Sequence, residues 1–118
     1  NFIKGRLKDG DPSIFVSNGG VEFPVGAQPP AHAKGRDLIY GVRPEHFRQS
    51  SVGIPARVVV VEPTGSETQV VVNVGGQELI TIFRDRIFAK PDEIMLLDVE
   101  AKATHLFDAE TGQRITSS

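Results

Sequence analysis

The chain has 118 residues, a length that suits one domain with a hydrophobic core of its own. Its 13 Lys and Arg residues are balanced by 15 Asp and Glu residues, and the net charge of -2 does not favour nucleic acid or an anionic membrane surface as a partner. The absence of cysteine excludes disulfides, thiolate metal sites and a cysteine nucleophile.

The first third of the chain reads as short strands separated by turns. Residues 2–7 alternate weakly and are followed by turn residues at 8–12, and a strand restarts at residues 14–16. Ser17-Asn18-Gly19-Gly20 is typical of a tight turn, which predicts a hairpin with residues 21–24. Residues 26–35, with two prolines and no apolar periodicity, are expected to form a surface loop.

The stretch Gly41-Val42-Arg43-Pro44-Glu45-His46-Phe47 closes an apolar strand at residues 38–40 and predicts one short helical turn. Pro44 has a fixed φ that suits the first helical position, and Glu45 lies where a helix dipole favours a carboxylate. We expect a mainly structural role for this stretch, with Arg43 and Glu45 tying the turn to neighbouring strands.

The rest of the chain is predicted to be β. The run Val58 to Val61 within residues 54–62 is too β-branched and too short for a helix, and it predicts a strand buried on both faces. Gly75-Gly76 predicts a two-residue hairpin loop, in a register that sets Val72 opposite Leu79 and Val71 opposite Ile80.

The last elements are a charged connection and two or three short strands. The connection, residues 83–92, has two apolar anchors, Ile87 and Phe88, and aliphatic residues follow at 93–99. A final strand is expected at residues 104–107, with a turn leading to Arg114. Short strands at this spacing, punctuated by Gly and Pro, predict an all-β fold, either a small barrel or a sandwich.

A search for catalytic, cofactor-binding and metal-binding patterns finds none. The sequence contains neither a phosphate-binding P-loop nor a dinucleotide-binding glycine motif. His32, His46 and His105 lie too far apart for zinc-ligand spacing, and Asp108 with Glu110 supplies too few ligands for calcium. We therefore predict no catalytic residue, no cofactor site and no metal site in this chain.

Two further stretches are notable. Glu62-Pro63-Thr64-Gly65-Ser66-Glu67-Thr68 reads as a β-turn in which Gly65 serves the backbone. Phe107-Asp108-Ala109-Glu110-Thr111-Gly112 reads as a strand end followed by a turn, with Phe107 inward and Asp108 accepting hydrogen bonds from its own loop.

Three motifs together resemble, in order and approximate spacing, the C-terminal regulatory (TOBE-type) domain of ATP-binding subunits of ABC importers of the maltose and glycerol-phosphate class. They are residues 41–46, residues 61–68, and residues 105–108 with Thr111-Gly112. The Asn1-Phe2-Ile3 start also resembles the beginning of that domain. The resemblance implies an OB-type β-fold and a single regulatory and dimerisation domain over residues 1–118. It also implies that the chain is a fragment lacking an upstream ATPase domain.

The same resemblance implies a site, partners and a location. It places four residues at or near the regulatory and dimer contact: Glu62, Gly65, Ser66 and Phe107. It identifies four others as residues of the family signature with a mainly structural role: Arg43, Pro44, Glu45 and His46. The implied full-length protein is a homodimeric transport ATPase that uses ATP and magnesium. It would work at the cytoplasmic face of the inner membrane with permease subunits and, in some members, a regulatory protein.

Two other functions remain open from the sequence. Related TOBE modules bind small anions such as molybdate, and Thr64-Gly65-Ser66 supplies donors of the kind such sites use. An oligonucleotide-binding barrel would need aromatic and basic residues on one face, for which Tyr40, Phe83 and Phe88 beside Arg84, Arg86 and Lys90 are the candidates.

Overall fold

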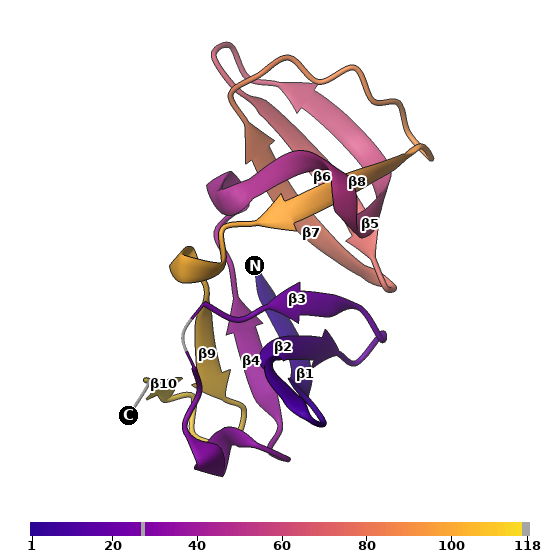
Figure 1. The fold of residues 1–118 in the computed structure, drawn as a ribbon. Helices are drawn as coiled ribbons and strands as arrows, with labels where there is room; N and C mark the ends of the chain where they lie inside the picture. Colours follow the sequence, from indigo (N-terminus) through magenta and orange to yellow (C-terminus); the bar gives the residue numbers. More distant parts are fainter. Residues whose placement is uncertain (27, 117–118) are drawn as a thin grey trace. The chain divides into compact units, whose positions relative to one another are not determined.

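The computed structural model describes residues 1–26 and 28–116, which form two compact units (Figure 1). Unit 1 consists of residues 1–42 together with the segment from Glu100 onward, and unit 2 consists of Arg43–Val99. The described residues form strands and short 3-10 turns, which confirms the predicted all-β fold. None of the described helices is long and apolar enough to cross a membrane.

Unit 1 is built on one antiparallel sheet with the strand order β10-β9-β4-β1-β2-β3. Its strands are β1 (Phe2–Lys8), β2 (Asp11–Ser17), β3 (Glu22–Pro24), β4 (Leu38–Gly41), β9 (His105–Asp108) and β10 (Arg114–Ile115). Two 3-10 turns, η1 (Ala31–Ala33) and η3 (Ala101–Ala103), were not predicted. The hairpin expected around residues 17–20 is present as β2 and β3.

Three aromatic side chains form the centre of the unit 1 core. The rings of Phe15 and Tyr40 stack with their centroids 5.1 Å apart, and the Phe23 ring lies 5.3 Å from that of Tyr40. All three side chains are buried, and the Tyr40 hydroxyl donates a hydrogen bond of 2.6 Å to the carbonyl of Pro24. Burial raises the pKa of Tyr40, because the ionised phenolate would lose its hydration.

The described part of residues 26–35 differs from the surface loop that we predicted, and residue 27 of this prediction lies outside the described residues. Pro29, Pro30 and Ala33 are buried, and residues 31–33 form η1. Proline rings are apolar and lose little conformational entropy on ordering, so a proline pair can pack into a core without regular secondary structure.

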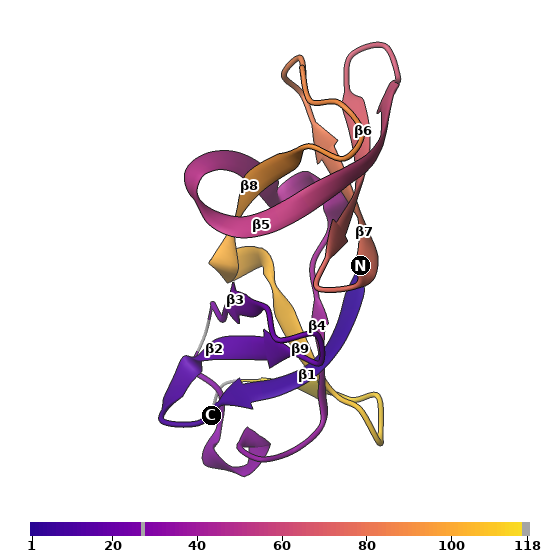
Figure 2. The same ribbon diagram turned by 90° about the vertical axis from the view of Figure 1, so that its right-hand side faces the viewer.

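Unit 2 is a four-stranded antiparallel sheet with the order β7-β6-β5-β8. Its elements are η2 (Pro44–His46), β5 (Phe47–Pro63), β6 (Thr68–Val74), β7 (Gln77–Phe83) and β8 (Ile94–Val99). Strand β5 is long and strongly curved, and it pairs with β8 and with β6 (Figure 2). Because β5 reaches both neighbours, it carries the core of this unit.

The β6–β7 hairpin matches its prediction. Gly75 and Gly76 have φ values of 58° and 89°, as a two-residue loop of this kind requires. The register pairs Val71 with Ile80 and Val72 with Leu79. The Asn73 side-chain oxygen accepts a hydrogen bond of 3.0 Å from the Gly76 N–H, which closes the loop.

Strand β5 differs from its prediction in length and in burial. It begins at Phe47 rather than at Ile54, because residues 48–53, four of which are polar, continue the strand through an irregularity in its pairing with β8. Val58 is fully buried, whereas Val59, Val60 and Val61 are only half-buried. An antiparallel sheet packs one face on its core and leaves the other face more open, so the run is not buried on both faces.

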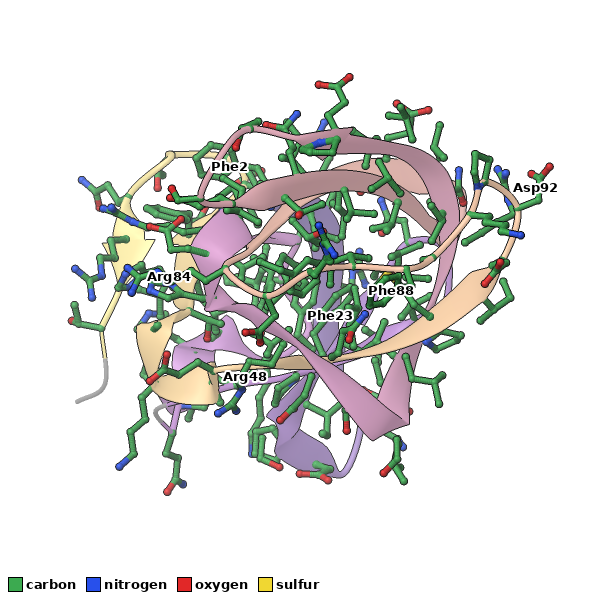
Figure 3. All side chains as sticks on the ribbon, turned by 90° about the horizontal axis from the view of Figure 1, so that it is seen from above. Phe2, Phe23, Arg48, Arg84, Phe88 and Asp92 are labelled. Atoms are coloured by element: carbon green, nitrogen blue, oxygen red, sulfur yellow. The ribbon has the colours of Figure 1, made fainter. Side chains whose placement is uncertain are left out.

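The connection between β7 and β8 contains neither helix nor strand. Phe88, expected to anchor it, is 80% exposed, whereas Ile87 is half-buried. Asp92 has a φ of 73° and points outward (Figure 3), and its carboxylate forms a 3.1 Å ion pair with Arg57 of β5.

Candidate functional site

The signature stretch forms the 3-10 turn η2, as predicted. The His46 N–H donates to the carbonyl of Arg43 at 3.0 Å, and Pro44 occupies the start of the turn. Arg43 and Glu45 are exposed, and within the described residues neither side chain forms an ion pair or a hydrogen bond. The expectation that these two charges tie the turn to neighbouring strands is therefore wrong, because both are left in solvent.

His46 is half-buried and has one shielded polar atom. Its Nδ1 has no hydrogen-bond partner among the described residues.

The second motif forms the connection between β5 and β6. The Thr64 N–H donates to the carbonyl of Glu67 at 2.8 Å, and the Thr64 hydroxyl donates to the same oxygen at 3.1 Å. Gly65 has a φ of 87°, which explains the glycine at this position. Glu62, Gly65 and Ser66 are all exposed, so this turn presents its side chains and backbone to solvent.

The third motif belongs to unit 1. Phe107 is half-buried in β9 rather than fully inward, and its ring meets that of Phe2 edge-on at 6.1 Å. Asp108 is buried, and as predicted its carboxylate accepts hydrogen bonds from its own loop, from the N–H groups of Glu110 at 2.9 Å and Thr111 at 3.1 Å. These bonds, with a weaker contribution from the Arg36 guanidinium at 3.2 Å, lower the pKa of Asp108 below its ordinary value.

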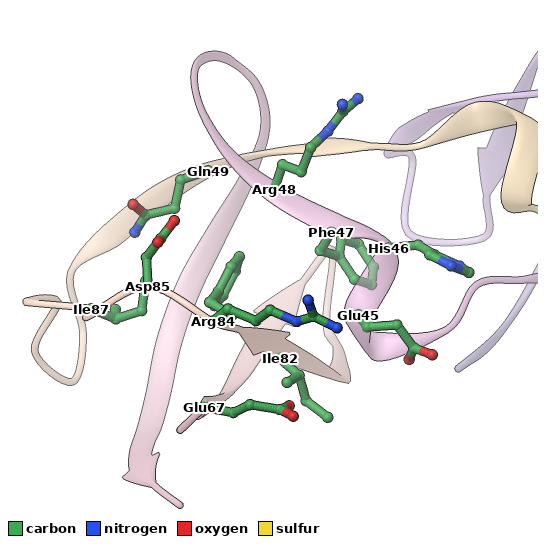
Figure 4. Close-up of a pocket in the computed structure, with 11 residues that line it drawn as sticks. Glu45, His46, Phe47, Arg48, Gln49, Glu67, Ile82, Arg84, Asp85 and Ile87 are labelled. Atoms are coloured by element: carbon green, nitrogen blue, oxygen red, sulfur yellow. The ribbon is translucent and has the colours of Figure 1, made fainter. Parts of the chain in front are cut away.

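A groove of about 930 Å³ in unit 2 brings parts of the first two motifs together (Figure 4). We call it the η2–β7 groove, and it is lined by Glu45, His46, Phe47, Arg48, Gln49, Glu67, Ile82, Phe83, Arg84, Asp85 and Ile87. Phe47 and Phe83 are buried and form its floor. The charged lining residues are exposed, except for the half-buried Glu67.

The charges of the η2–β7 groove are unevenly paired. Arg48 is held by Asp98 at 3.1 Å, a pair that joins β5 to β8. Figure 4 shows the Arg84 side chain extending toward Glu45. Within the described part of the chain, Arg84, Glu45, Glu67 and Asp85 form no ion pair.

Two features of the described residues bear on the chemistry of the groove. The described residues contain no group of three His, Asp or Glu side chains placed to hold a metal ion. The groove is lined by no serine, threonine or lysine that could act as a nucleophile beside His46.

The sequence did not predict that Arg84 and Asp85 would lie across the groove from Glu45. The only signal was their position in a charged connection that follows a strand. The residues assigned to a regulatory contact fall in both units, with Glu62, Gly65 and Ser66 in unit 2 and Phe107 in unit 1.

Comparison with protein families gives two matches. Residues 1–47 match the MalK OB fold domain, and residues 40–107 match the TOBE domain. The two matches overlap at the signature stretch and together account for most of the chain.

Similar proteins are ABC transporter ATP-binding proteins. An uncharacterised ABC transporter ATP-binding protein of Sinorhizobium fredii is 41% identical over 115 residues, which are 98% of this chain and 31% of that protein. The sulfoquinovosyl glycerol transport ATP-binding protein SmoE of Agrobacterium fabrum is 34% identical, over 98% of this chain and 33% of its own length. The sn-glycerol-3-phosphate import ATP-binding protein UgpC of Salmonella typhimurium is 34% identical, over 86% of this chain and 29% of its own length.

Among solved structures, the cytoplasmic molybdate-binding protein ModG is similar with a TM-score of 0.72 at 14% identity, over 90% of this chain and 94% of that one. This likeness concerns the fold alone. The chain spans about a third of the length of the ATP-binding proteins that it matches. On the family matches and the fold, the chain belongs to the TOBE domain family, and its residues 1–47 are similar to the MalK OB fold domain.

Proposed function

We propose that this chain is the C-terminal regulatory and dimerisation domain of an ABC transporter ATP-binding subunit that energises import of a sugar or sugar-like solute. The observation that carries the proposal is the TOBE domain match, with relatives named for glycerol-3-phosphate and sulfoquinovosyl glycerol transport. The chain itself would be a binding module, and catalysis would belong to the ATPase domain of the full-length protein.

The full-length protein is proposed to be a homodimer that binds ATP and magnesium in its ATPase domains and contacts permease subunits at the cytoplasmic face of the membrane. A permanent contact between two regulatory domains raises the effective concentration of the ATPase halves. The halves can then separate after hydrolysis without losing each other.

The proposed contact surfaces are the turn with Glu62, Gly65 and Ser66 and the strand end with Phe107. The turn is exposed and is held by two hydrogen bonds to the Glu67 carbonyl, which gives a partner a fixed surface. Either a second copy or a cytoplasmic regulatory protein is a candidate for this surface, and nucleic acid is not proposed as a partner.

The test uses the full-length subunit with and without residues 1–118. Light scattering in the absence of nucleotide should give a dimer for the intact subunit and a monomer for the truncated one. Ser66→Arg should weaken the dimer or the binding of a regulatory protein, whereas Ser51→Arg, at another exposed serine of unit 2, should not. Equal dimerisation with and without residues 1–118 would remove the dimerisation role.

A second candidate function is small-anion binding, which the likeness to the fold of ModG favours. Calorimetric titration with molybdate, tungstate and sulfate distinguishes it, since heat of binding from any of the three would support an anion site. An absence of heat with all three would leave the transporter function as the sole proposal.

A further inference from the structure

The η2–β7 groove has an apolar floor and an excess of unpaired negative charge. Phe47 and Phe83 are buried beneath it, and Ile82 and Ile87 are half-buried beside them. Three carboxylates at the rim form no ion pair among the described residues, namely those of Glu45, Glu67 and Asp85. The guanidinium of Arg84, also at the rim, likewise forms no ion pair among these residues. The unpaired rim therefore carries three carboxylates against one guanidinium.

The chemistry of this rim favours a ligand that donates hydrogen bonds and carries positive charge. Carboxylates are acceptors only, and they bond most strongly to guanidinium and ammonium groups. An anion bound in the groove would lie near Arg84 but also near carboxylates on either side of it. Arg48 does not offset these carboxylates, because it is already paired with Asp98. Electrostatic complementarity therefore selects against acidic ligands.

The spacing of the carboxylates argues for an extended ligand rather than a single ion. They come from η2, from the residue before β6 and from the segment after β7, and the described residues do not gather any three acidic or histidine side chains around one point. A volume of about 930 Å³ is in the range of pockets that hold drug-sized ligands or a short stretch of peptide.

We propose that the η2–β7 groove binds a segment of a partner protein that presents Lys or Arg side chains next to apolar ones. The basic side chains pair with Glu45, Glu67 and Asp85, and the apolar side chains lie over Phe47 and Phe83. The proposal concerns the groove alone and does not depend on whether the chain dimerises or serves a transporter.

The test is an NMR titration of the 118-residue chain labelled with nitrogen-15, using two matched capped tripeptides as probes, acetyl-Leu-Arg-Ile-amide and acetyl-Leu-Glu-Ile-amide. The arginine peptide should shift the amide signals of residues 45–49, 67 and 82–87, with at least about fivefold higher affinity than the glutamate peptide. Glu45→Gln and Glu67→Gln should each weaken binding of the arginine peptide about threefold, and added salt should weaken it further.

Glu110→Gln is the matched control, because Glu110 is an exposed carboxylate of unit 1 and lies outside the groove. It should leave the affinity unchanged. Equal or tighter binding of the glutamate peptide would overturn the proposal, since it would make the groove a site for acidic segments. The proposal is also overturned if neither peptide shifts the groove amides at millimolar concentration.

Discussion

Asp108 shows how a single buried carboxylate makes the stability of unit 1 depend on pH. The N–H groups of Thr111 and Glu110 and the charge of Arg36 lower its folded pKa below the ordinary 3.8. A lowered folded pKa contributes stability above the unfolded value, and this contribution is lost as the pH falls through the folded pKa. Asp108→Asn should therefore lower the urea midpoint at pH 7, and the difference from the wild type should shrink as the pH falls below 3.8.

The matched control for this prediction is Asp9→Asn, at an exposed aspartate in the β1–β2 turn. Its effect on the urea midpoint should be small. A difference between Asp108→Asn and the wild type that stays constant from pH 7 to pH 3 would assign the effect to lost geometry rather than to charge.

Tyr40 separates the contribution of a hydrogen bond from that of packing. Tyr40→Phe removes the hydrogen bond to the Pro24 carbonyl and keeps the ring against Phe15 and Phe23, so the free energy of unfolding should fall by about 1 kcal/mol. Tyr40→Ala also removes the ring from a fully buried site and should cost about 3–5 kcal/mol. Both free energies are measured by urea denaturation monitored by circular dichroism. Equal losses for the two variants would contradict a separate contribution of the buried ring.

Strand β5 depends on a glycine at its irregularity. Gly53 has a φ of 153°, and a Cβ atom there would clash with the Leu97 carbonyl oxygen of β8. Gly76 also has a positive φ, of 89°, but a Cβ atom there would meet nothing within 4 Å. Gly53→Ala should therefore destabilise the protein by at least about 1 kcal/mol more than Gly76→Ala, as measured by thermal or urea unfolding. Equal losses would mean that the backbone of β8 moves away at no cost.

Local sequence patterns predicted some of these elements correctly but not others. The β6–β7 register followed from Gly75-Gly76 and from alternation, because a two-residue loop fixes the pairing of both strands. The start of β5 could not be found in the same way, since residues 48–51 are polar, and Arg48 and Gln49 pair with Asp98 and Leu97, about 50 positions later in the chain.

The candidate site could be predicted from the sequence only in part, because sequence patterns report on neighbouring residues and not on distant ones. Motifs located the turns at residues 44–46 and 64–67, because prolines, glycines and hydroxyl side chains act on their immediate neighbours. The groove requires η2 to lie beside β7, which begins more than 30 residues later. No local pattern signals that approach, so Asp85 was seen only as part of a charged connection, and Arg84 also as a candidate basic residue of an oligonucleotide-binding face.

At the scale of the whole molecule, each of the two units is small. A domain of about 60 residues buries only about 60% of the surface of its unfolded chain, so each unit by itself is only marginally stable. We therefore expect residues 1–118 to unfold as the single domain predicted from the sequence. Leu97→Ala, in the unit 2 core, should reduce hydrogen-exchange protection in unit 1 as well, measured by mass spectrometry.

Leu38→Ala, in the core of unit 1, is the reciprocal variant and should likewise reduce protection in unit 2. If either substitution loosened only its own unit, the two units would be independent folding domains.

The path of the chain through the unit 1 sheet has a consequence for the engineering of this fold. Strands β4 and β9 are antiparallel neighbours, with Gly41 opposite His105, yet unit 2 lies between them in sequence. Unit 2 is therefore an insertion, in sequence, between two neighbouring strands of the unit 1 sheet. A short bridge between β4 and β9 in place of residues 43–99 would join the two strands directly, and the pairing of the remaining sheet would then measure how well unit 1 folds without unit 2.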